Sequence, residues 1–546
     1  MFQQCGGPTR AGTATPWHAD IVPSQEFENR IGTPAPPHAV STNSSARRRI
    51  SSVGKNAIVN HRHMPSAESP RYQRGLHRMT KPLVIMLVTI IVGWLAMIVA
   101  YALPNGPVRA HVTSSAEIIE TQGAFPQLVG GRAANAIPDN NTDAWMLLMA
   151  EYDGPHTIIE KSLGNYYVQR GITDAGIPGY DSLIANTRAQ LDPNGEDAAK
   201  PTQTASYARY WHGYMLPLRL LLEVCDYSNI RILLIAAVVA IIAAISYTLA
   251  RRGLAAFAVA FVGLHTLMLP VTPMLSMQFA TVWFIAMISM LLLLRYPSIR
   301  TGRLGYPCFF MLVGATTSYM DLLSYPLFSF GICAVTAYVL SHATAQTASI
   351  TYVDDPDKQR SSDQPIGPGH IIGYAAAWAA GYGVMWAAKW VIGAAVLGRT
   401  VITDALHQVA VRASSSAQQP GEAGTTTVSY WGTLARNISP YAMPAHVLLV
   451  LLVLLVLAVM IIRKGRRSGS TTVTRMFRSA NPLPMAMVAL APFIWLALTE
   501  NHSYIHRNFV CSILAISGFA IFGYLAVLAD TVDTSQPRVP DTSGNA

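Results

Sequence analysis

Charged side chains are scarce in this sequence of 546 residues. Asp, Glu, Lys and Arg together make up 12% of the chain, about half of the roughly 25% in an average soluble domain. Hydrophobic residues make up 51%, and they come in long blocks. This balance excludes a disordered, solvating chain and argues against an ordinary soluble enzyme.

Cysteine is also scarce. The chain has five cysteines, widely spaced and without a Cys-x-x-Cys pair. The spacing excludes a disulfide framework and gives no sign of a cysteine-based zinc site. We expect at most one disulfide.

Positive charge gathers near the N-terminus. Residues 1–81 hold eleven Lys and Arg against four acids, whereas the remaining residues are close to neutral. The segment is rich in Ser, Pro, His and Thr and has no apolar periodicity, so we expect it to be disordered. A basic cytoplasmic flank of a first membrane span explains it best. A nucleic-acid-binding arm is the alternative, and we expect no nucleic-acid partner. Met79 is a second plausible start of the chain.

The long apolar blocks predict an all-α polytopic membrane protein. A bilayer core of about 30 Å needs roughly 20 apolar residues of helix. About ten spans are expected, near residues 83–103, 230–250, 253–270, 274–294, 305–320, 322–341, 370–393, 443–462, 483–499 and 508–529.

Basic residues in the short connections predict the orientation. Pairs and runs such as Arg251-Arg252 and Arg463-Lys464 fall on the same side of the ten-span arrangement as the basic N-terminus. The positive-inside rule then places both termini, including a tail of residues 531–546, in the cytoplasm of a multi-pass cell-membrane protein. Within the transmembrane domain of residues 82–530, a long first loop of about residues 105–229 and a second of about 395–441 face outward.

Local patterns refine three regions. Helix-like stretches are expected around residues 143–151 and 208–224, the second as an interfacial helix. The apolar block from Gly305 to Leu340 is too long for one span, so it is expected to turn near Ser318–Pro326. The Ala-, Gly- and Trp-rich stretch 374–394 predicts close helix packing.

Polar residues gather on the outer face in this topology. The four stretches are residues 139–145, 207–214, 318–321 and 500–507. Polar groups at membrane depth are expensive, so distant stretches converging on one face suggest a single extracytoplasmic site. This convergence is the main indication of function.

Each stretch also has a plainer interpretation. Asn141 or Thr142, followed by Asp143, fits a helix N-cap. His502 and His506 lie one helical turn apart, a spacing that presents two imidazoles together, but no third metal ligand is specified. The run 207–214 is aromatic enough for an interfacial belt as well as for a binding platform.

The layout resembles the GT-C superfamily of polytopic glycosyltransferases, which use polyprenyl-phosphate-linked sugars at the outer face. Four short stretches are similar to a group of bacterial envelope proteins within it: Asp139-Asn-Asn-Thr-Asp143, Tyr207-Ala-Arg-Tyr-Trp-His-Gly-Tyr214, Asp321-Leu-Leu-Ser-Tyr-Pro326 and Asn501-His-Ser-Tyr-Ile-His506. The usual closely spaced acidic pair is absent, because Asp139 and Asp143 are four residues apart.

The resemblance implies transfer of a sugar from a polyprenyl-phosphate-linked donor to a cell-envelope glycan or lipid acceptor. Such a reaction needs a carboxylate as general base and donors for the departing phosphate. Asp143 is the first candidate for the base, with Asp139 and Asp321 behind it. The substrate-binding candidates are Arg209, His212, Tyr214, His502, His506 and Arg507.

Of these, Arg209 and Arg507 would bind phosphate, and the histidines would bind sugar hydroxyls or phosphate. No cofactor is specified, and a divalent metal ion is left open. We expect the polyprenyl chain of the donor to lie in the membrane lipid.

Two other classes fit the hydropathy. A transporter or flippase of lipid-linked precursors would carry charges along several mid-membrane helices and broken spans in paired positions. A non-catalytic envelope assembly protein would not need the clustered Asp, Arg and His. The charge-poor spans and the polar outer face favour the enzyme.

Overall fold

The computed structural model describes residues 70–128, 136–173, 176–301, 305–351, 365–418, 425–468 and 480–530. The chain divides into two units, with the boundary after Val84 within helix α1. Of the smaller unit, residues 70–84 are described, at the start of helix α1.

Long apolar helices dominate the described residues, which confirms the predicted all-α membrane protein in its coarse form. Seven helical segments within the described residues are long and apolar enough to cross a membrane. They lie in α1 (Pro70–Ala102), α8 (Tyr227–Arg251), α11 (Met277–Arg295), α14 (Leu327–Thr351), α16 (Pro368–Leu397), α19 (Pro444–Ser468) and the run formed by α23 (Arg507–Val510), η3 (Cys511–Leu514) and α24 (Ala515–Asp530).

Three further helices occupy the remaining expected ranges but are shorter. They are α9 (Ala255–Met268), α13 (Gly305–Met320) and α21 (Leu483–Leu498). With 14 to 16 residues each, they reach about 21–24 Å at the rise of an α-helix, less than the roughly 30 Å of a bilayer core. The count of ten spans therefore stays a prediction.

The long helices fall into an inner and an outer group. Between 72% and 83% of the apolar windows of α11, α14 and the 507–530 run is buried, against 17% to 22% in α1, α8, α16 and α19. The outer helices expose apolar side chains such as Leu87, Val239 and Leu452. A helix that is apolar on its exposed side suits a lipid environment, where burial in protein is not needed.

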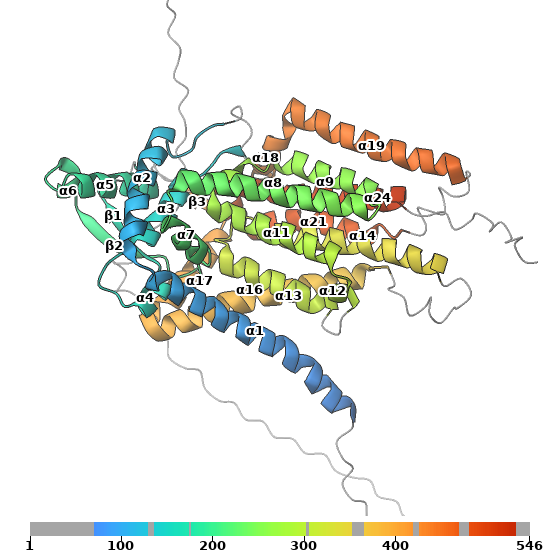
Figure 1. Ribbon diagram of the computed structural model, residues 1–546, viewed down its shortest axis with the longest axis horizontal. Helices are drawn as coiled ribbons and strands as arrows, with labels where there is room; N and C mark the ends of the chain where they lie inside the picture. Colours follow the sequence, from blue (N-terminus) through green and yellow to red (C-terminus); the bar gives the residue numbers. More distant parts are fainter. Residues whose placement is uncertain are drawn as a thin grey trace, which may run out of the picture. The chain divides into compact units, whose positions relative to one another are not determined.

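The shorter elements gather mostly at one end of the helices, on the left in Figure 1, which we call the loop end. From the first long connection come α2 (Asn105–Gln122), α3 (Asn140–Glu151), α4 (Ile158–Gly164), β1 (Tyr166–Arg170), α5 (Pro178–Leu191), α6 (Glu196–Ala199), β2 (Thr202–Ser206) and α7 (Met215–Leu222). From the later ones come α10 (Val271–Leu275), α17 (Thr400–Arg412), β3 (Ser416–Gln418), β4 (Thr425–Thr427), α18 (Tyr430–Ile438), η2 (Ser439–Ala442) and α22 (Glu500–Ile505). The short α12 (Pro297–Thr301) lies at the opposite end.

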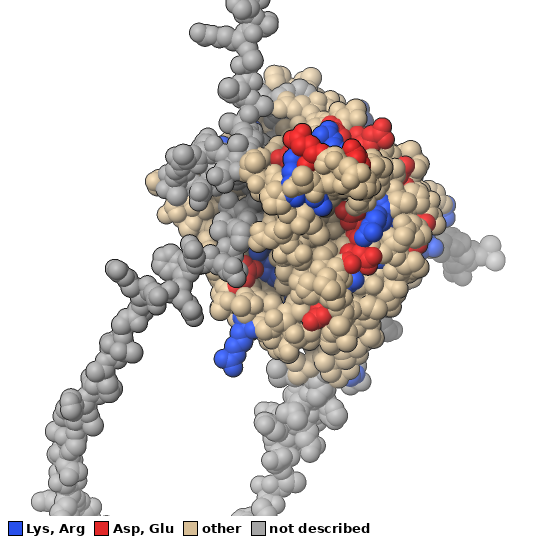
Figure 2. Space-filling view, turned by 90° about the vertical axis from the view of Figure 1, so that its left-hand side faces the viewer, with Lys and Arg blue, Asp and Glu red and all other residues tan. Residues whose placement is uncertain are grey.

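Two small two-stranded antiparallel sheets complete the loop end. Strand β1 pairs with β2 from Tyr166↔Ser206 to Arg170↔Thr202, and β3 pairs with β4. Acidic and basic side chains are interspersed over the largely uncharged surface that faces the viewer in Figure 2.

Two sequence expectations need correction. The stretch 208–224 is helical only from Met215 to Leu222, because His212 adopts a left-handed backbone (φ 57°) that a helix cannot continue through. Helix α1 begins at Pro70, so residues 70–81 are helical where disorder was expected. Extending an existing helix through Arg, Gln and Leu is far easier than nucleating one. Residues 1–69 and 531–546 lie outside the described residues.

The predicted hairpin and the predicted close packing are both confirmed. Helix α13 ends at Met320 and α14 begins at Leu327. Helix α13 packs against α16 through glycines. A Cβ on Gly314 would lie 2.0 Å from the carbonyl oxygen of Trp378, and one on Gly381 would lie 1.9 Å from that of Met311. Only glycine permits such a close backbone approach.

The four cysteines within the described residues are all free thiols. Cys5 lies outside the described residues.

Candidate functional site

The aromatic run 207–214 is an irregular, buried segment rather than an exposed interfacial belt. Tyr210, Trp211 and Tyr214 are almost fully buried. Side chains of α16 hold the backbone of the run in place: the indole N–H groups of Trp386 and Trp390 both donate to the Arg209 carbonyl at 3.1 Å. The run is therefore built into the protein, with its Arg and His side chains fixed against the helices.

Two arginines flank one ring of this run. The Arg209 guanidinium lies 4.5 Å from the ring centre of Tyr207 and 6.0 Å from that of Tyr210. Arg412, the last residue of α17, lies 5.9 Å from the ring centre of Tyr210. Arg209 forms an ion pair with Asp404 at 3.2 Å, whereas Arg412 has no ion pair within the described part of the chain. We call Arg209, Tyr210 and Arg412 the arginine cluster.

Asp321 lies at the turn between α13 and α14, and its charge acts on Tyr210 of the arginine cluster. It is 1% exposed and accepts hydrogen bonds from the Ser324 backbone N–H at 3.1 Å and from the Ser324 hydroxyl. Burial raises the pKa of Asp321 to about 6. Burial also raises the pKa of Tyr210, with Arg412 opposing the rise and Asp321 adding to it. The carboxyl and the arginines therefore act on the same phenol.

Helix α22 brings two histidines to this turn. His502 Nε2 lies 2.8 Å from the Leu323 carbonyl oxygen, so Nε2 carries the proton and Nδ1 is a hydrogen-bond acceptor. Nδ1 is buried without a partner within the described residues. The His506 ring lies 4.8 Å from that of His502. His502 thus offers a buried lone pair beside Asp321 and the arginine cluster.

Both ring nitrogens of the third histidine, His212, are hydrogen-bonded within the protein. His212 Nε2 lies 3.0 Å from the Tyr207 carbonyl oxygen, and its Nδ1 lies 2.8 Å from the Tyr214 hydroxyl. The first contact fixes the proton on Nε2, so the Tyr214 hydroxyl donates to Nδ1. His212 fixes the shape of the segment and has no ring nitrogen left for a substrate.

All three imidazoles are neutral near pH 7. Burial lowers the pKa of His212 to about 3, and the Lys389 cation adds to the effect. Burial, with the Arg412 cation, lowers the pKa of His506 to about 3. Burial also lowers the pKa of His502 well below its usual range. The positive charge of the arginine cluster therefore comes from the two arginines alone.

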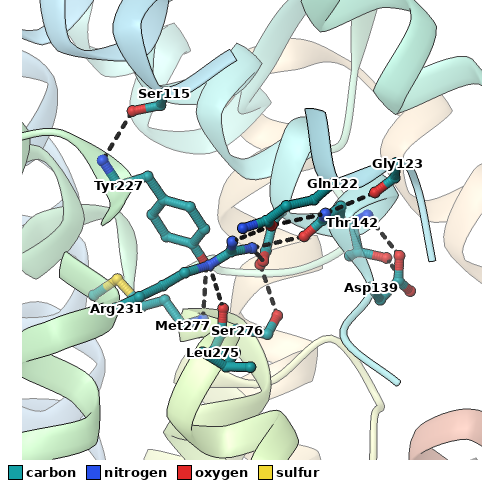
Figure 3. Close-up of polar contacts among 12 residues, drawn as sticks. Ser115, Gln122, Gly123, Asp139, Thr142, Tyr227, Arg231, Leu275, Ser276 and Met277 are labelled. Atoms are coloured by element: carbon teal, nitrogen blue, oxygen red, sulfur yellow. Dashed lines mark hydrogen bonds and ion pairs between the residues drawn. The ribbon is translucent and has the colours of Figure 1, made fainter. Parts of the chain in front are cut away.

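Asp143 belongs to a second cluster at the start of α3, in which Arg231, Gln122 and Ser276 lie as Figure 3 shows. It is fully buried and pairs with Arg231 of α8 at 3.3 Å, and the Ser276 hydroxyl donates to it at 2.7 Å. Burial raises the pKa of Asp143 to about 6, although Arg231 opposes the rise. Arg231 also donates to Gln122, Asn140 and the Leu275 carbonyl at 2.6–2.7 Å. Every strong donor and acceptor of this pair is thus used inside the protein.

Asp139, rather than Asn141 or Thr142, caps α3. Its carboxylate accepts from the Thr142 backbone N–H at 2.9 Å and from the Thr142 hydroxyl at 2.7 Å. Burial raises its pKa from the usual value. Asp143, one turn into the helix, has no capping role.

The charges of both clusters act on Tyr214. Burial is the main reason that its pKa is raised well above the usual value, and the charges of Asp143 and Asp321 both contribute. Of the nine candidate residues, six therefore meet around the arginine cluster. They are Arg209, His212, Tyr214, Asp321, His502 and His506. Asp143 belongs to the cluster around Arg231, and Asp139 caps the same helix. Arg507 directly follows His506 and is half-buried at the start of α23.

Three charged residues of these clusters were not identified in the sequence: Arg231, Asp404 and Arg412. Arg231 could have been noticed as the one charge within an otherwise apolar span. Asp404 and Arg412 lie in an ordinary amphipathic helix of the second loop, and no local signal separates them from its other polar residues.

Within the described residues, no group of three or more His, Cys, Asp or Glu side chains is placed to hold a metal ion. His502 and His506 therefore find no third ligand of these types there.

No known family model matches this chain, and no curated protein or solved structure matches it either.

Proposed function

We propose that this protein is a membrane glycosyltransferase that moves a sugar from a polyprenyl-phosphate-linked donor to a cell-envelope glycan or lipid acceptor at the extracytoplasmic face. The arginine cluster beside Asp321 is the observation that carries the proposal. It combines an anion site and a buried carboxyl at the end of apolar helices.

The arginine cluster suits a phosphate. Arg412 lacks a carboxylate partner within the described residues, and Arg209 is fixed by Asp404 and by stacking on Tyr207. Arginine binds phosphate oxygens through parallel N–H groups, and such charge-assisted bonds are strong when partly buried. The polyprenyl chain of the donor would lie against the apolar helices next to the loop end.

Asp321 suits the role of general base better than Asp143 does. Protonation of Asp143 would leave the buried Arg231 guanidinium without its carboxylate, which is strongly unfavourable. Asp321 has no ion pair within the described part of the chain, so it can take up a proton without breaking one. In this proposal Asp143 supports the site through its ion pair.

The proposed reaction follows from these positions. The acceptor hydroxyl gives its proton to Asp321, and its oxygen attacks the anomeric carbon of the donor sugar. The bond from that carbon to the phosphate oxygen breaks, and polyprenyl phosphate leaves with the electron pair. Arg412 and Arg209 stabilise the charge that grows on the phosphate. His502 Nδ1 accepts a hydrogen bond from a sugar hydroxyl.

A flippase of lipid-linked precursors is the alternative that shares the arginine cluster. It would bind the same phosphate but would have no use for a proton acceptor beside it. Transfer of labelled sugar from a polyprenyl-phosphate donor by purified protein in detergent distinguishes the two.

The anion site can be tested by binding. Purified protein is expected to bind undecaprenyl phosphate and not undecaprenol, which lacks the phosphate. Arg412→Met should weaken phosphate-lipid binding about 10- to 100-fold, the usual scale for a charge-assisted hydrogen bond. Arg399→Met, at the opposite end of the same helix region, should leave binding unchanged. Equal binding of the two lipids would contradict the proposal.

The extracytoplasmic location can be tested by labelling. Single cysteines at the exposed positions Asp192 and His407 of the loop end are expected to react with a membrane-impermeant maleimide in intact cells. Cysteines at the exposed Ser298 and Arg466 should react only after permeabilisation. Cys5 and Cys225 would be replaced by serine beforehand. Labelling of the Ser298→Cys variant but not of the Asp192→Cys variant in intact cells would show the opposite membrane orientation.

A further inference from the structure

A pocket of about 180 Å³ lies in the loop end, at the C-terminal end of α3. Residues of α2, α3, β1 and α5 line it, and none of them belongs to the arginine cluster. Glu151 in its wall is eight residues from Asp143, about 12 Å along an α-helix. The pocket is therefore a separate place for a ligand.

Glu151 is the unusual group in this pocket. It is 7% exposed and receives one long hydrogen bond, from the Gln190 side chain at 3.4 Å. It is the last residue of α3, where the helix dipole disfavours a negative charge. Burial raises its pKa to about 7. A buried acid in such an unfavourable position, facing a pocket, is typical of a ligand-binding site.

Two arginines complete the polar wall. Arg170 is fixed by the Asn186 side chain at 2.9 Å and by three backbone carbonyls that contact its Nη1. Its Nη2 takes no part in these bonds. Arg109 pairs with Asp153 at 3.6 Å and is 47% exposed. The pocket therefore presents two guanidinium donors and two carboxyl groups side by side.

We propose that this pocket binds a single neutral sugar ring of the acceptor. That the bound sugar belongs to the acceptor rests on the proposed function, whereas the binding of a sugar by this pocket does not. Neighbouring ring hydroxyls both donate and accept, so they match a carboxylate and a guanidinium side by side. A phosphate or a carboxylated sugar would face the carboxylate of Asp153 and, above about pH 7, that of Glu151 as well. The volume is below the range of typical small-molecule sites, which favours one ring over an oligosaccharide.

The test measures binding of methyl glycosides to the purified full-length protein by saturation-transfer NMR. Methyl α-glucoside, methyl α-mannoside and methyl β-galactoside are the probes, and saturable binding of at least one is expected near the millimolar range that weak polar ligands reach. Glu151→Gln and Arg109→Met should each weaken it about tenfold, the scale of a hydrogen bond to a charged group. Glu120→Gln, in a surface ion pair with Arg188 outside the pocket, should leave it unchanged.

Several results would overturn the inference. They are no saturable binding of any glycoside, binding that survives both pocket substitutions, and binding of ethylamine in place of the glycosides, which would identify a cation site. Undecaprenyl phosphate binding is measured on the same variants and should not change in Glu151→Gln. Wild-type protein that binds undecaprenyl phosphate but no glycoside would thus contradict the pocket inference alone, and wild-type protein that binds a glycoside but not undecaprenyl phosphate would contradict the proposed function alone.

Discussion

Replacing Asp321 by asparagine is expected to lower sugar transfer by about 100-fold or more, the usual scale for losing a general base. Asparagine has the same size, and its oxygen can still accept from the Ser324 backbone N–H, so the thermal unfolding midpoint should stay near that of the wild type. The measurement is the rate of label transfer from the polyprenyl-phosphate donor, with unfolding followed in the same detergent.

Asp226 provides a matched control. Its carboxylate also accepts from the backbone N–H three residues ahead, that of Asn229 at 3.0 Å, as the N-cap of α8. Asparagine caps helices about as well as aspartate, so Asp226→Asn should change neither transfer nor stability. Near-normal transfer by Asp321→Asn would remove Asp321 from the role of base.

The pH profile gives a second readout of the same role. The base must be ionised to accept a proton, and burial places the pKa of Asp321 at about 6. Wild-type kcat/KM should therefore fall as the pH drops through about 6, and the residual activity of Asp321→Asn should lack this decline. A merely structural aspartate would not produce that difference.

Replacing Asp143 by asparagine is expected to destabilise the protein by about 3–5 kcal/mol, because it leaves the buried Arg231 guanidinium without its carboxylate. Arg231→Met should be milder, since Asp143 can then become protonated, whereas arginine cannot lose its proton. Denaturant unfolding in detergent measures both. Near-wild-type stability of Asp143→Asn would show that the Arg231 guanidinium does not depend on this carboxylate.

The exposed pair of Glu120 and Arg188 provides the control for this ion pair. Its side chains are 37% and 56% exposed, so Glu120→Gln should change stability by no more than about 1 kcal/mol. The double variant Asp143→Asn with Arg231→Met should be more stable than Asp143→Asn alone, because it removes the unpaired charge. Additive losses in the double variant would show that the two residues act independently.

Much of the helix arrangement was readable in the sequence. Every expected span range holds a helix, and the turn at Asp321 lies where the long apolar block had to reverse. The glycines of α16 do allow the close helix contact that their frequency predicted. The sequence predicted the ends of helices less well. Helix α1 begins already at Pro70, and the run 207–214 is not helical. Helix ends depend on caps and on neighbouring segments, which hydropathy does not describe.

The candidate site was only partly readable. The polar stretches around Asp321, Arg209 and His502 were recognised because polar groups stand out between apolar blocks. The division of the polar residues into two separate clusters was not predicted. Asp143 pairs with a residue 88 positions away, and Arg209 pairs with one 195 positions away. Neither pairing leaves a trace in the local sequence.

The sequence by itself determined that the chain is an all-α membrane protein with polar loops between apolar helices, because hydropathy over about 20 residues is a local property set by the bilayer. The tertiary structure alone decided which polar groups neutralise one another and which stay available. Arg231 satisfies Asp143, whereas within the described residues Arg412 has no ion pair and His502 Nδ1 has no hydrogen-bond partner. That distinction depends on which helices lie next to each other, and so on packing between segments far apart in the chain.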